Sequence, residues 1–315
     1  MNGACSICLE PVEAEENAHA RCVQHLFGTT RMPAVDVDRG KLHTLGLAMA
    51  GRTSISGIQK KVSLGLTSDR MTLRLALEGG MYILKPSSEH FPNMPENELL
   101  TMRVAEAAGV EVAACGLVTL VDGSRGYVTA RFDRTRQGRK RRQEDFCQLG
   151  LKAPKEKYEG SAELCVRLLR KYSTEAPIEL LRWFRLAVVV WWTGNGDMHL
   201  KNFSLVADDE GRFKLSPAYD LVCTRLYIGD DPLALPVGGK RDQLTARSWV
   251  DLARYCALPP KAARRVVAEV VSAGPRAEKL ISRSGLPEDM QRAYRALIET
   301  RARVLTEAAD KLVSR

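Results

Sequence analysis

The hydrophobic pattern changes along the chain, and this change constrains the fold more than any other feature of the sequence. Before about residue 130, short segments alternate apolar and polar residues with the period of two that is typical of β-strands, as in KVSLGL, MTLRLAL and RGYVTARF. After about residue 160, longer segments follow the helical period, as in PIELLRWFRLAVVVWW and PKAARRVVAEVVSA. The pattern predicts an α+β protein with a β-rich N-terminal lobe and a helical C-terminal lobe.

The chain divides into three regions on this basis. We expect an N-terminal extension over residues 1–30, a β-rich lobe over 31–133 and a mainly helical lobe over 134–315. With 45% hydrophobic residues, the sequence has enough apolar material for two cores. No secretory signal is visible, and the apolar run at 186–192 is far too short to span a bilayer. Eight scattered cysteines favour free thiols, so we expect a cytoplasmic protein with no membrane partner.

The chain is basic, with 47 Lys and Arg residues against 38 Asp and Glu residues and a formal charge of +9. This charge suits an anionic partner, although a soluble basic protein without such a partner has the same property. The run RTRQGRKRR over 134–142 is either a solvated loop or a docking site for an acidic protein face or a bound tRNA. Direct contact with nucleic acid therefore stays open.

A cluster of polar residues follows the apolar run, in the stretch GNGDMHLKNFSLV over residues 194–206. Asp197 and Asn202 have the D-x4-N spacing of phosphotransferase catalytic loops, in which the Asp orients a hydroxyl group and the Asn holds magnesium. His199 lies between them and is a candidate donor to a phosphoryl group, with a structural role as the alternative. The spacing alone is a weak signal, because chance matches are common.

A second carboxylate strengthens this interpretation. The stretch FSLVADDEGRFKLSPAYDLV predicts a hairpin that returns the chain to Asp220, beside Asn202. An amide oxygen and a carboxylate are ligands that magnesium takes together with phosphate oxygens and water. The alternative is that Asp220 caps a helix that begins at Leu221.

Two residues upstream can supply and orient a positive charge for nucleotide phosphates. Lys85 ends the apolar strand MYILK, and Glu98 lies in the first turn of the predicted helix PENELLTMRVAEAAG. We expect Glu98 to pair with Lys85, while Glu96 is the competing partner.

A phosphate loop is expected before this strand. Ser54, Ser56 and Gly57 lie in GRTSISGIQKK, where hydroxyl groups and backbone amides beside a glycine can surround a phosphate. A plain hairpin turn is the alternative.

Seven motifs occur in a fixed order from residue 54 to about residue 222: SISGIQKKVSL, YILKP, ENELLTMRVAEAAG, ARFDR, QEDFCQ, GNGDMHLKNFSLV and SPAYDLV. Together they resemble the HipA family of bacterial serine/threonine kinase toxins. A typical member has an extra N-terminal subdomain of about a hundred residues before the serine-rich loop. Only 53 residues precede Ser54 here, and this difference resembles the shortened HipT kinases, as does the paired-serine SIS.

The resemblance implies a bilobed, kinase-like fold that uses ATP and Mg²⁺. It implies that Asp197 and His199 are catalytic and that Asn202 and Asp220 hold Mg²⁺. The residues implied to bind ATP are Ser54, Ser56, Gly57, Lys85, Glu98, Arg131 and Phe132. Family members often have an acidic residue before RFDR, where this chain has Ala130, so only a backbone contact to adenine is expected there.

The resemblance also implies partners and regulation. A HipB-like DNA-binding antitoxin and a HipS-like small protein are the implied partners, and an aminoacyl-tRNA synthetase is the implied substrate. The family further implies that the kinase phosphorylates itself on Ser54 or Ser56 and thereby switches itself off.

The N-terminal extension contains a separate candidate site. Cys5 and Cys8 form one Cys-x2-Cys pair, and His19 and Cys22 form a His-x2-Cys pair. Four ligands in two such pairs suit a closed tetrahedral zinc site. Three free thiols and a surface histidine are the alternative, and the sequence leaves both open.

Two other functions remain compatible with the sequence. Kinases of small molecules, such as antibiotics or sugars, use a similar order of D-x4-N and a later Asp. A basic, zinc-containing module that binds nucleic acid with a degenerate kinase core is the non-enzymatic alternative. The presence of Lys85, Asp197, Asn202 and Asp220 argues against degeneracy.

Overall fold

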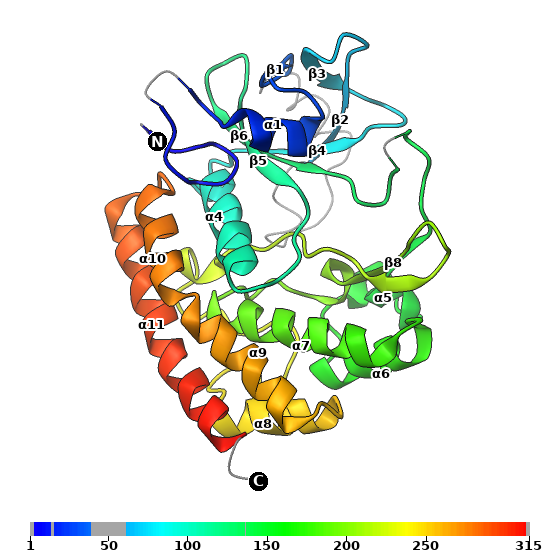
Figure 1. Ribbon diagram of the computed structural model, residues 1–315, viewed down its shortest axis with the longest axis vertical. Helices are drawn as coiled ribbons and strands as arrows, with labels where there is room; N and C mark the ends of the chain where they lie inside the picture. The colour runs from blue at the N-terminus through cyan, green and yellow to red at the C-terminus, as the bar shows by residue number, and fades with distance from the viewer. Residues whose placement is uncertain (1–2, 14–15, 39–60, 136, 313–315) are drawn as a thin grey trace. The chain divides into compact units, whose positions relative to one another are not determined.

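The computed structural model describes residues 3–13, 16–38, 61–135 and 137–312 (Figure 1). The chain divides into two compact units. The first consists of residues 1–103, 113–140 and 282–286, and the second of residues 104–112, 141–281 and 287–315. Neither unit is a single continuous segment, because the chain passes between them more than once.

The first unit contains a six-stranded sheet. Its strands, in spatial order, are β1 (Ala34–Val35), β3 (Thr72–Leu75), β2 (Val62–Leu66), β4 (Tyr82–Pro86), β6 (Arg125–Ala130) and β5 (Cys115–Thr119). Neighbouring strands are antiparallel, except that β1 and β3 are parallel. The alternating segments of the sequence become strands, since KVSLGL contains β2, MTLRLAL contains β3 and RGYVTARF contains β6.

One face of this sheet is packed against the N-terminal part of the chain. Leu64 lies opposite Tyr82 in the sheet, and alternate residues of a strand point to the same face, so Leu64 and Leu84 lie on one face. Neither residue has exposed surface. They share a hydrophobic cluster with helix α1 (Ala20–Phe27), and the Phe27 ring lies 5.4 Å from the ring of Tyr82. The N-terminal extension is therefore part of the core of the first unit.

Helix α4 (Met94–Ala107) confirms the helix predicted from PENELLTMRVAEAAG. Asn93 precedes it with a φ of 57°, and Gly109 follows it with a φ of 79°. Positive φ is easily adopted by glycine and tolerated by asparagine, so these two residues turn the chain at the ends of the helix.

The second unit is mainly helical. Its helices are α5 (Phe146–Leu149), α6 (Ala162–Tyr172), α7 (Ala176–Trp192), α8 (Ala246–Tyr255), α9 (Pro260–Ser272), α10 (Gly274–Arg283), whose last two residues belong to the first unit, and α11 (Glu288–Lys311). A three-stranded antiparallel sheet contains β7 (Gln143–Asp145), β8 (Ser204–Ala207) and β9 (Phe213–Leu215) in that order. Short 3-10 turns are η1 (Pro154–Glu156), η2 (Leu200–Asn202) and η3 (Thr224–Leu226).

Helix α7 contains the apolar run of the sequence and lies in the core of the second unit. Trp183 and Trp192 of this helix are buried, and the indole N–H of Trp192 donates to the carbonyl of Ile298 in α11 at 3.0 Å. The guanidinium of Arg301 donates to the carbonyl of Trp191, and burial lowers the pKa of Arg301 to about 10. The two helices are thus joined by polar contacts inside an apolar core.

The α+β class predicted from the sequence is confirmed, with a sheet-based first unit and a helical second unit. Within the described ranges, no helix has both the length and the apolar character that crossing a membrane requires.

Candidate active site

A buried ion pair connects the sheet of the first unit to helix α4. The Nζ atom of Lys85, on β4, lies 2.6 Å from Oε1 of Glu98, and the two side chains are 9% and 2% exposed. Burial raises the pKa of the Glu98 carboxyl, and the charge of Lys85 opposes that rise. Glu96, the competing partner in the sequence, instead lies 3.8 Å from Arg125. The pair with Glu98 holds the Lys85 ammonium group in a defined position.

The segment after β6 contains Arg131, one of the two residues expected at an adenine hinge. Its backbone N–H donates to the carbonyl of Met81 at 2.9 Å, and its guanidinium binds both carboxylate oxygens of Asp133 at 2.9 and 2.8 Å. Burial alone would raise the pKa of Asp133, but Arg131 and Arg134 hold it below its usual range. Because the sheet already uses the N–H of Arg131, an adenine contact at this segment has to use another backbone group.

Two asparagine side chains organise the polar loop after α7, and one of them connects it with the segment that contains Asp220. Asn195 accepts a hydrogen bond from the N–H of Asp197 at 3.0 Å and donates to the carbonyl of Asp220 at 3.3 Å. The amide of Asn202 donates to the carbonyl of Asp197 at 3.0 Å. Three of the four residues assigned to catalysis and magnesium, Asp197, Asn202 and Asp220, therefore belong to one hydrogen-bond network within the second unit.

Tyr219 makes a second connection between the same segments. Its hydroxyl donates to the carbonyl of Lys201 at 2.9 Å and lies 2.6 Å from the hydroxyl of Ser204. Burial raises the pKa of Tyr219, which keeps the hydroxyl neutral and able to donate. The segment before Asp220 is thus attached to η2 and to β8.

Asp220 has an unusual backbone conformation, with a φ of 57°. A residue other than glycine rarely adopts positive φ, and such residues are frequent at functional sites. No helix begins at Leu221, and the next helical turn is η3, which starts at Thr224. The alternative role of Asp220 as a helix cap is therefore wrong.

A tyrosine that the sequence analysis did not identify contacts the candidate catalytic aspartate. The hydroxyl of Tyr158 donates to Oδ1 of Asp197. The ring of His199 packs edge-on against the ring of Tyr158, with centroids 5.1 Å apart, and His199 is only 2% exposed. The buried His199 ring therefore packs within the second unit and supports the loop that contains Asp197.

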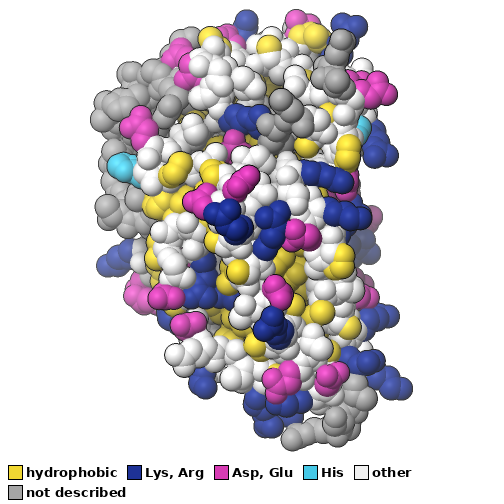
Figure 2. Space-filling view, turned by 90° about the vertical axis from the view of Figure 1, so that its left-hand side faces the viewer, with side chains coloured by type: hydrophobic (Ala, Val, Ile, Leu, Met, Phe, Trp, Pro, Cys, Tyr) yellow, Lys and Arg dark blue, Asp and Glu magenta, His cyan; other side chains and the backbone are white. Residues whose placement is uncertain are grey.

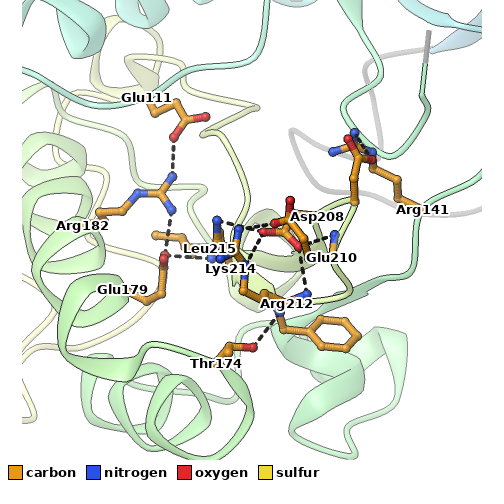
Figure 3. Close-up of polar contacts among 12 residues, drawn as sticks. Glu111, Arg141, Thr174, Glu179, Arg182, Asp208, Glu210, Arg212, Lys214 and Leu215 are labelled. Carbon is orange, nitrogen blue, oxygen red and sulfur yellow. Dashed lines mark hydrogen bonds and ion pairs between the residues drawn. The ribbon is translucent and has the colours of Figure 1, made fainter.

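The hairpin predicted between Asn202 and Asp220 is present as β8 and β9, and a network of charged residues holds its turn (Figure 3). Asp208 accepts from Arg212 at 2.9 Å and lies 2.9 Å from Nζ of Lys214, and these partners hold its pKa well below the usual range. Buried Glu179 of α7 accepts from the N–H of Leu215 at 2.9 Å. The hairpin is thereby fixed at its turn and at its outer strand.

The basic run at 134–142 is partly engaged within the chain. Arg134 pairs with Asp133 at 2.6 Å, Arg141 pairs with Asp209 at 2.8 Å, and the Arg142 guanidinium lies 5.2 Å from the Phe213 ring. Figure 2 views the molecule from the left-hand side of Figure 1, and on that face basic and acidic side chains are interspersed. These contacts engage Arg134, Arg141 and Arg142 within the chain, whereas Arg139 and Lys140 are exposed.

The remaining predicted residues fall into two groups. Ser54, Ser56 and Gly57 lie outside the described residues. Cys5, Cys8, His19 and Cys22 are brought together, and their ligand atoms all lie within 4.8 Å of one another.

The donor set around the polar loop fits a magnesium ion. Asp220 offers carboxylate oxygens and Asn202 an amide oxygen, which are the hard ligands that magnesium prefers. The NH₂ group of Asn202 is used by the carbonyl of Asp197, so the amide orientation is fixed with its oxygen on the other side. The residues present are therefore chemically suitable for the metal that phosphoryl transfer requires.

The family of the chain follows from comparison with known proteins. A family model for the HipA-like C-terminal domain matches residues 53–277, so the chain belongs to the HipA-like family. The solved structure of HipA from Shewanella oneidensis, in a complex of the toxin–antitoxin system with HipB and operator DNA, has the same fold. It superposes with a TM-score of 0.67 at 23% identity, over 82% of this chain and 67% of that chain.

Individual relatives support the same membership. Y4mE of Sinorhizobium fredii, named as a kinase by inference, is 33% identical over 231 residues, which cover 70% of this chain and 54% of the relative. The serine/threonine-protein kinase toxin HipA of Shewanella oneidensis is 27% identical over 242 residues, which cover 70% of this chain and 51% of that protein. The chain thus spans about half the length of these relatives.

Removal of the Glu98 carboxylate is expected to destabilise the first unit strongly. Glu98→Ala leaves the ammonium group of Lys85 buried without its carboxylate, which costs about 3–5 kcal/mol in comparable buried pairs. Urea unfolding of the full chain, followed by circular dichroism, measures the loss. Glu96→Ala is the matched control, because the partner of Glu96 is more exposed and more distant. Equal losses in the two variants would contradict the importance of the buried pair.

Proposed function

We propose that this chain is an ATP-dependent serine/threonine protein kinase that acts as a toxin. The observation that supports this most directly is the hydrogen-bond network in which Asn195 links Asp197 to the carbonyl of Asp220, while Asn202 donates to the carbonyl of Asp197. Membership of the HipA-like family supports the same class of reaction. The name of the Shewanella relative supports the serine/threonine specificity and the toxin role.

Phosphoryl transfer depends mainly on positioning and on charge, and the proposed roles follow from that. Asp197 orients the substrate hydroxyl and accepts its proton, while Tyr158 holds the carboxylate in place. Asn202 and Asp220 would hold Mg²⁺, and the bound ion would supply positive charge to the ATP phosphates. The resemblance assigns Lys85, which pairs with Glu98, to the ATP phosphates.

Three further assignments complete the proposed roles of residues at and around the nucleotide site. His199 is assigned as a positioning residue rather than a phosphate contact, because its ring is buried against Tyr158. Phe132 and the carbonyl of Arg131 remain the proposed hinge. Ser54, Ser56 and Gly57 are proposed to form the phosphate loop, on the strength of the sequence alone.

The proposed target is an aminoacyl-tRNA synthetase in the cytoplasm, and the proposed partners are a HipB-like antitoxin and a HipS-like small protein. The Shewanella HipA structure contains HipB and operator DNA. This supports the proposal that the present chain, a relative of HipA, also has a DNA-binding antitoxin. The HipS-like partner and the synthetase rest on the sequence resemblance to HipT. The small-molecule kinase is the remaining enzymatic alternative, and the assay below separates it.

The central test is Asp197→Asn, which removes the proton acceptor with little change in size. We expect phosphoryl transfer to fall about 10²–10⁴-fold, while ATP binding and the thermal midpoint of unfolding stay close to those of the wild type. Radiolabelled ATP is incubated with the purified chain, a synthetase panel, and small-molecule acceptors. Asp209→Asn, in the exposed hairpin turn, is the matched control. Near-normal transfer by Asp197→Asn refutes the assignment, and label on small molecules alone favours the alternative kinase.

The role of Tyr158 is tested separately. Tyr158→Phe removes one hydroxyl that donates to Asp197, and we expect kcat to fall about tenfold with little change in the KM for ATP, as for loss of one charged hydrogen bond. Tyr255→Phe, which removes a surface hydroxyl near Arg167, is the control and should leave kcat unchanged. An unchanged kcat in Tyr158→Phe would show that the contact does not position Asp197.

Self-phosphorylation is expected on Ser54, Ser56 or both. Phosphate adds about −1.5 to −2 charges beside the proposed nucleotide site, so the modified form should bind ATP poorly. Mass spectrometry of the wild type and of Asp197→Asn after expression measures the modification. The double variant Ser54→Ala, Ser56→Ala should lose it, whereas Ser87→Ala, Ser88→Ala should retain it. Phosphate that is equally abundant on Asp197→Asn would remove the self-regulation claim and leave the kinase assignment standing.

A further inference from the structure

Four potential soft-metal ligands converge in the N-terminal extension of the first unit. The ligand atoms of Cys5, Cys8, His19 and Cys22 lie within 4.8 Å of one another. The Nδ1 atom of His19 is 3.4 Å from Sγ of Cys8 and 3.8 Å from Sγ of Cys22. None of the three cysteines is in a disulfide.

The backbone builds this cluster from two local turns. The first lies between the paired residues Ala4 and Pro11, where the N–H of Leu9 donates to the carbonyl of Cys5 at 3.0 Å. Leu9 directly follows Cys8 with a φ of 61°, which turns the chain after the ligand pair. The ligand pair is thus provided by a tight turn rather than by a regular strand.

The second pair lies at the start of helix α1. His19 is the residue that precedes the helix, and the N–H of Cys22 donates to its carbonyl at 2.9 Å. Residues three apart in a helical turn face the same side, so the imidazole and the thiol point toward one place.

A further hydrogen bond fixes the histidine in the form that binds a metal. Nε2 of His19 lies 2.9 Å from the carbonyl of Pro11, which can only accept, so Nε2 carries the proton. In the neutral imidazole, Nδ1 is then the nitrogen with the lone pair, and it is the one that faces the sulfurs. A ligating histidine usually donates its other N–H in this way.

We propose that these four side chains bind one structural Zn²⁺ ion. Three thiolates and one imidazole form a closed tetrahedral set, which suits zinc and leaves no position for a substrate. Thiolates select zinc over magnesium and calcium, because soft ligands prefer soft or borderline metals. Binding releases the thiol protons to solvent.

The position of the cluster indicates what the metal does. The N–H of Leu117 in β5 donates to the carbonyl of Ser6 at 2.7 Å, within the first ligand turn. A Cβ atom at Gly116 would lie 2.9 Å from Ile7, so the turn packs closely on this strand. The zinc ion therefore fastens the extension to the sheet that carries Lys85, and metal binding stabilises that sheet.

The experiment measures metal in the full chain, purified without a histidine tag. Elemental analysis is expected to give about one zinc per chain. The double variant Cys5→Ser, Cys8→Ser should lose the metal, whereas Cys147→Ser, which changes a thiol in the second unit, should retain it. His19→Cys should also retain zinc, because it keeps four soft ligands, while His19→Ala should lose most of it. Iron in place of zinc, or loss of metal in the Cys147→Ser control, overturns the proposal.

A second measurement on the wild type remains valid if the cysteine variants do not fold. Zinc is removed with a chelator, and Co²⁺ is added as a spectroscopic probe. Tetrahedral coordination by three thiolates and an imidazole should give thiolate charge-transfer bands and visible d–d bands, and stoichiometric Zn²⁺ should abolish them. The thermal midpoint should fall on chelation and recover with Zn²⁺. Absence of these bands together with an unchanged midpoint would exclude the site, whatever the result for kinase activity.

Discussion

The end of helix α7 is the constraint on which the candidate catalytic loop depends. A buried helix leaves its last carbonyl groups without helical partners, and each needs another donor. Here the Thr193 hydroxyl donates to Val189 at 2.8 Å, and the N–H groups of Gly194 and Asn195 return to carbonyls of the helix. Gly194 has a φ of 75°, and a Cβ atom there would lie 2.5 Å from a leucine side chain. The chain therefore turns at a fixed point, and the loop that contains Asp197 starts from a rigid helix end.

The sequence predicted the parts of the structure that depend on local pattern. Strand and helix periods gave the α+β class, and the spacing of Asp197 and Asn202 identified the loop that follows α7. The pair between Lys85 and Glu98 was also predictable, because a strand end and the next helix start are close along the chain. Comparison with known proteins then confirmed the HipA-like family.

Other features depended on contacts that local pattern does not encode. Tyr158 is 39 residues from Asp197, and nothing in its own surroundings indicated the hydrogen bond between them. The bridging role of Asn195 required knowledge that the carbonyl of Asp220 lies nearby. The positive φ of Asp220 is set by its surroundings, because aspartate adopts that conformation only rarely.

The contacts at strand β9 have a consequence for association between chains. β9 is an edge strand, and its outward N–H groups would ordinarily offer a template for a strand of another molecule. The N–H of Phe213 is taken by the hydroxyl of Thr174 at 2.9 Å, and that of Leu215 by the carboxylate of Glu179 at 2.9 Å (Figure 3). These two side chains occupy the outward N–H groups of Phe213 and Leu215, so this edge of the sheet is protected from intermolecular β-pairing and aggregation.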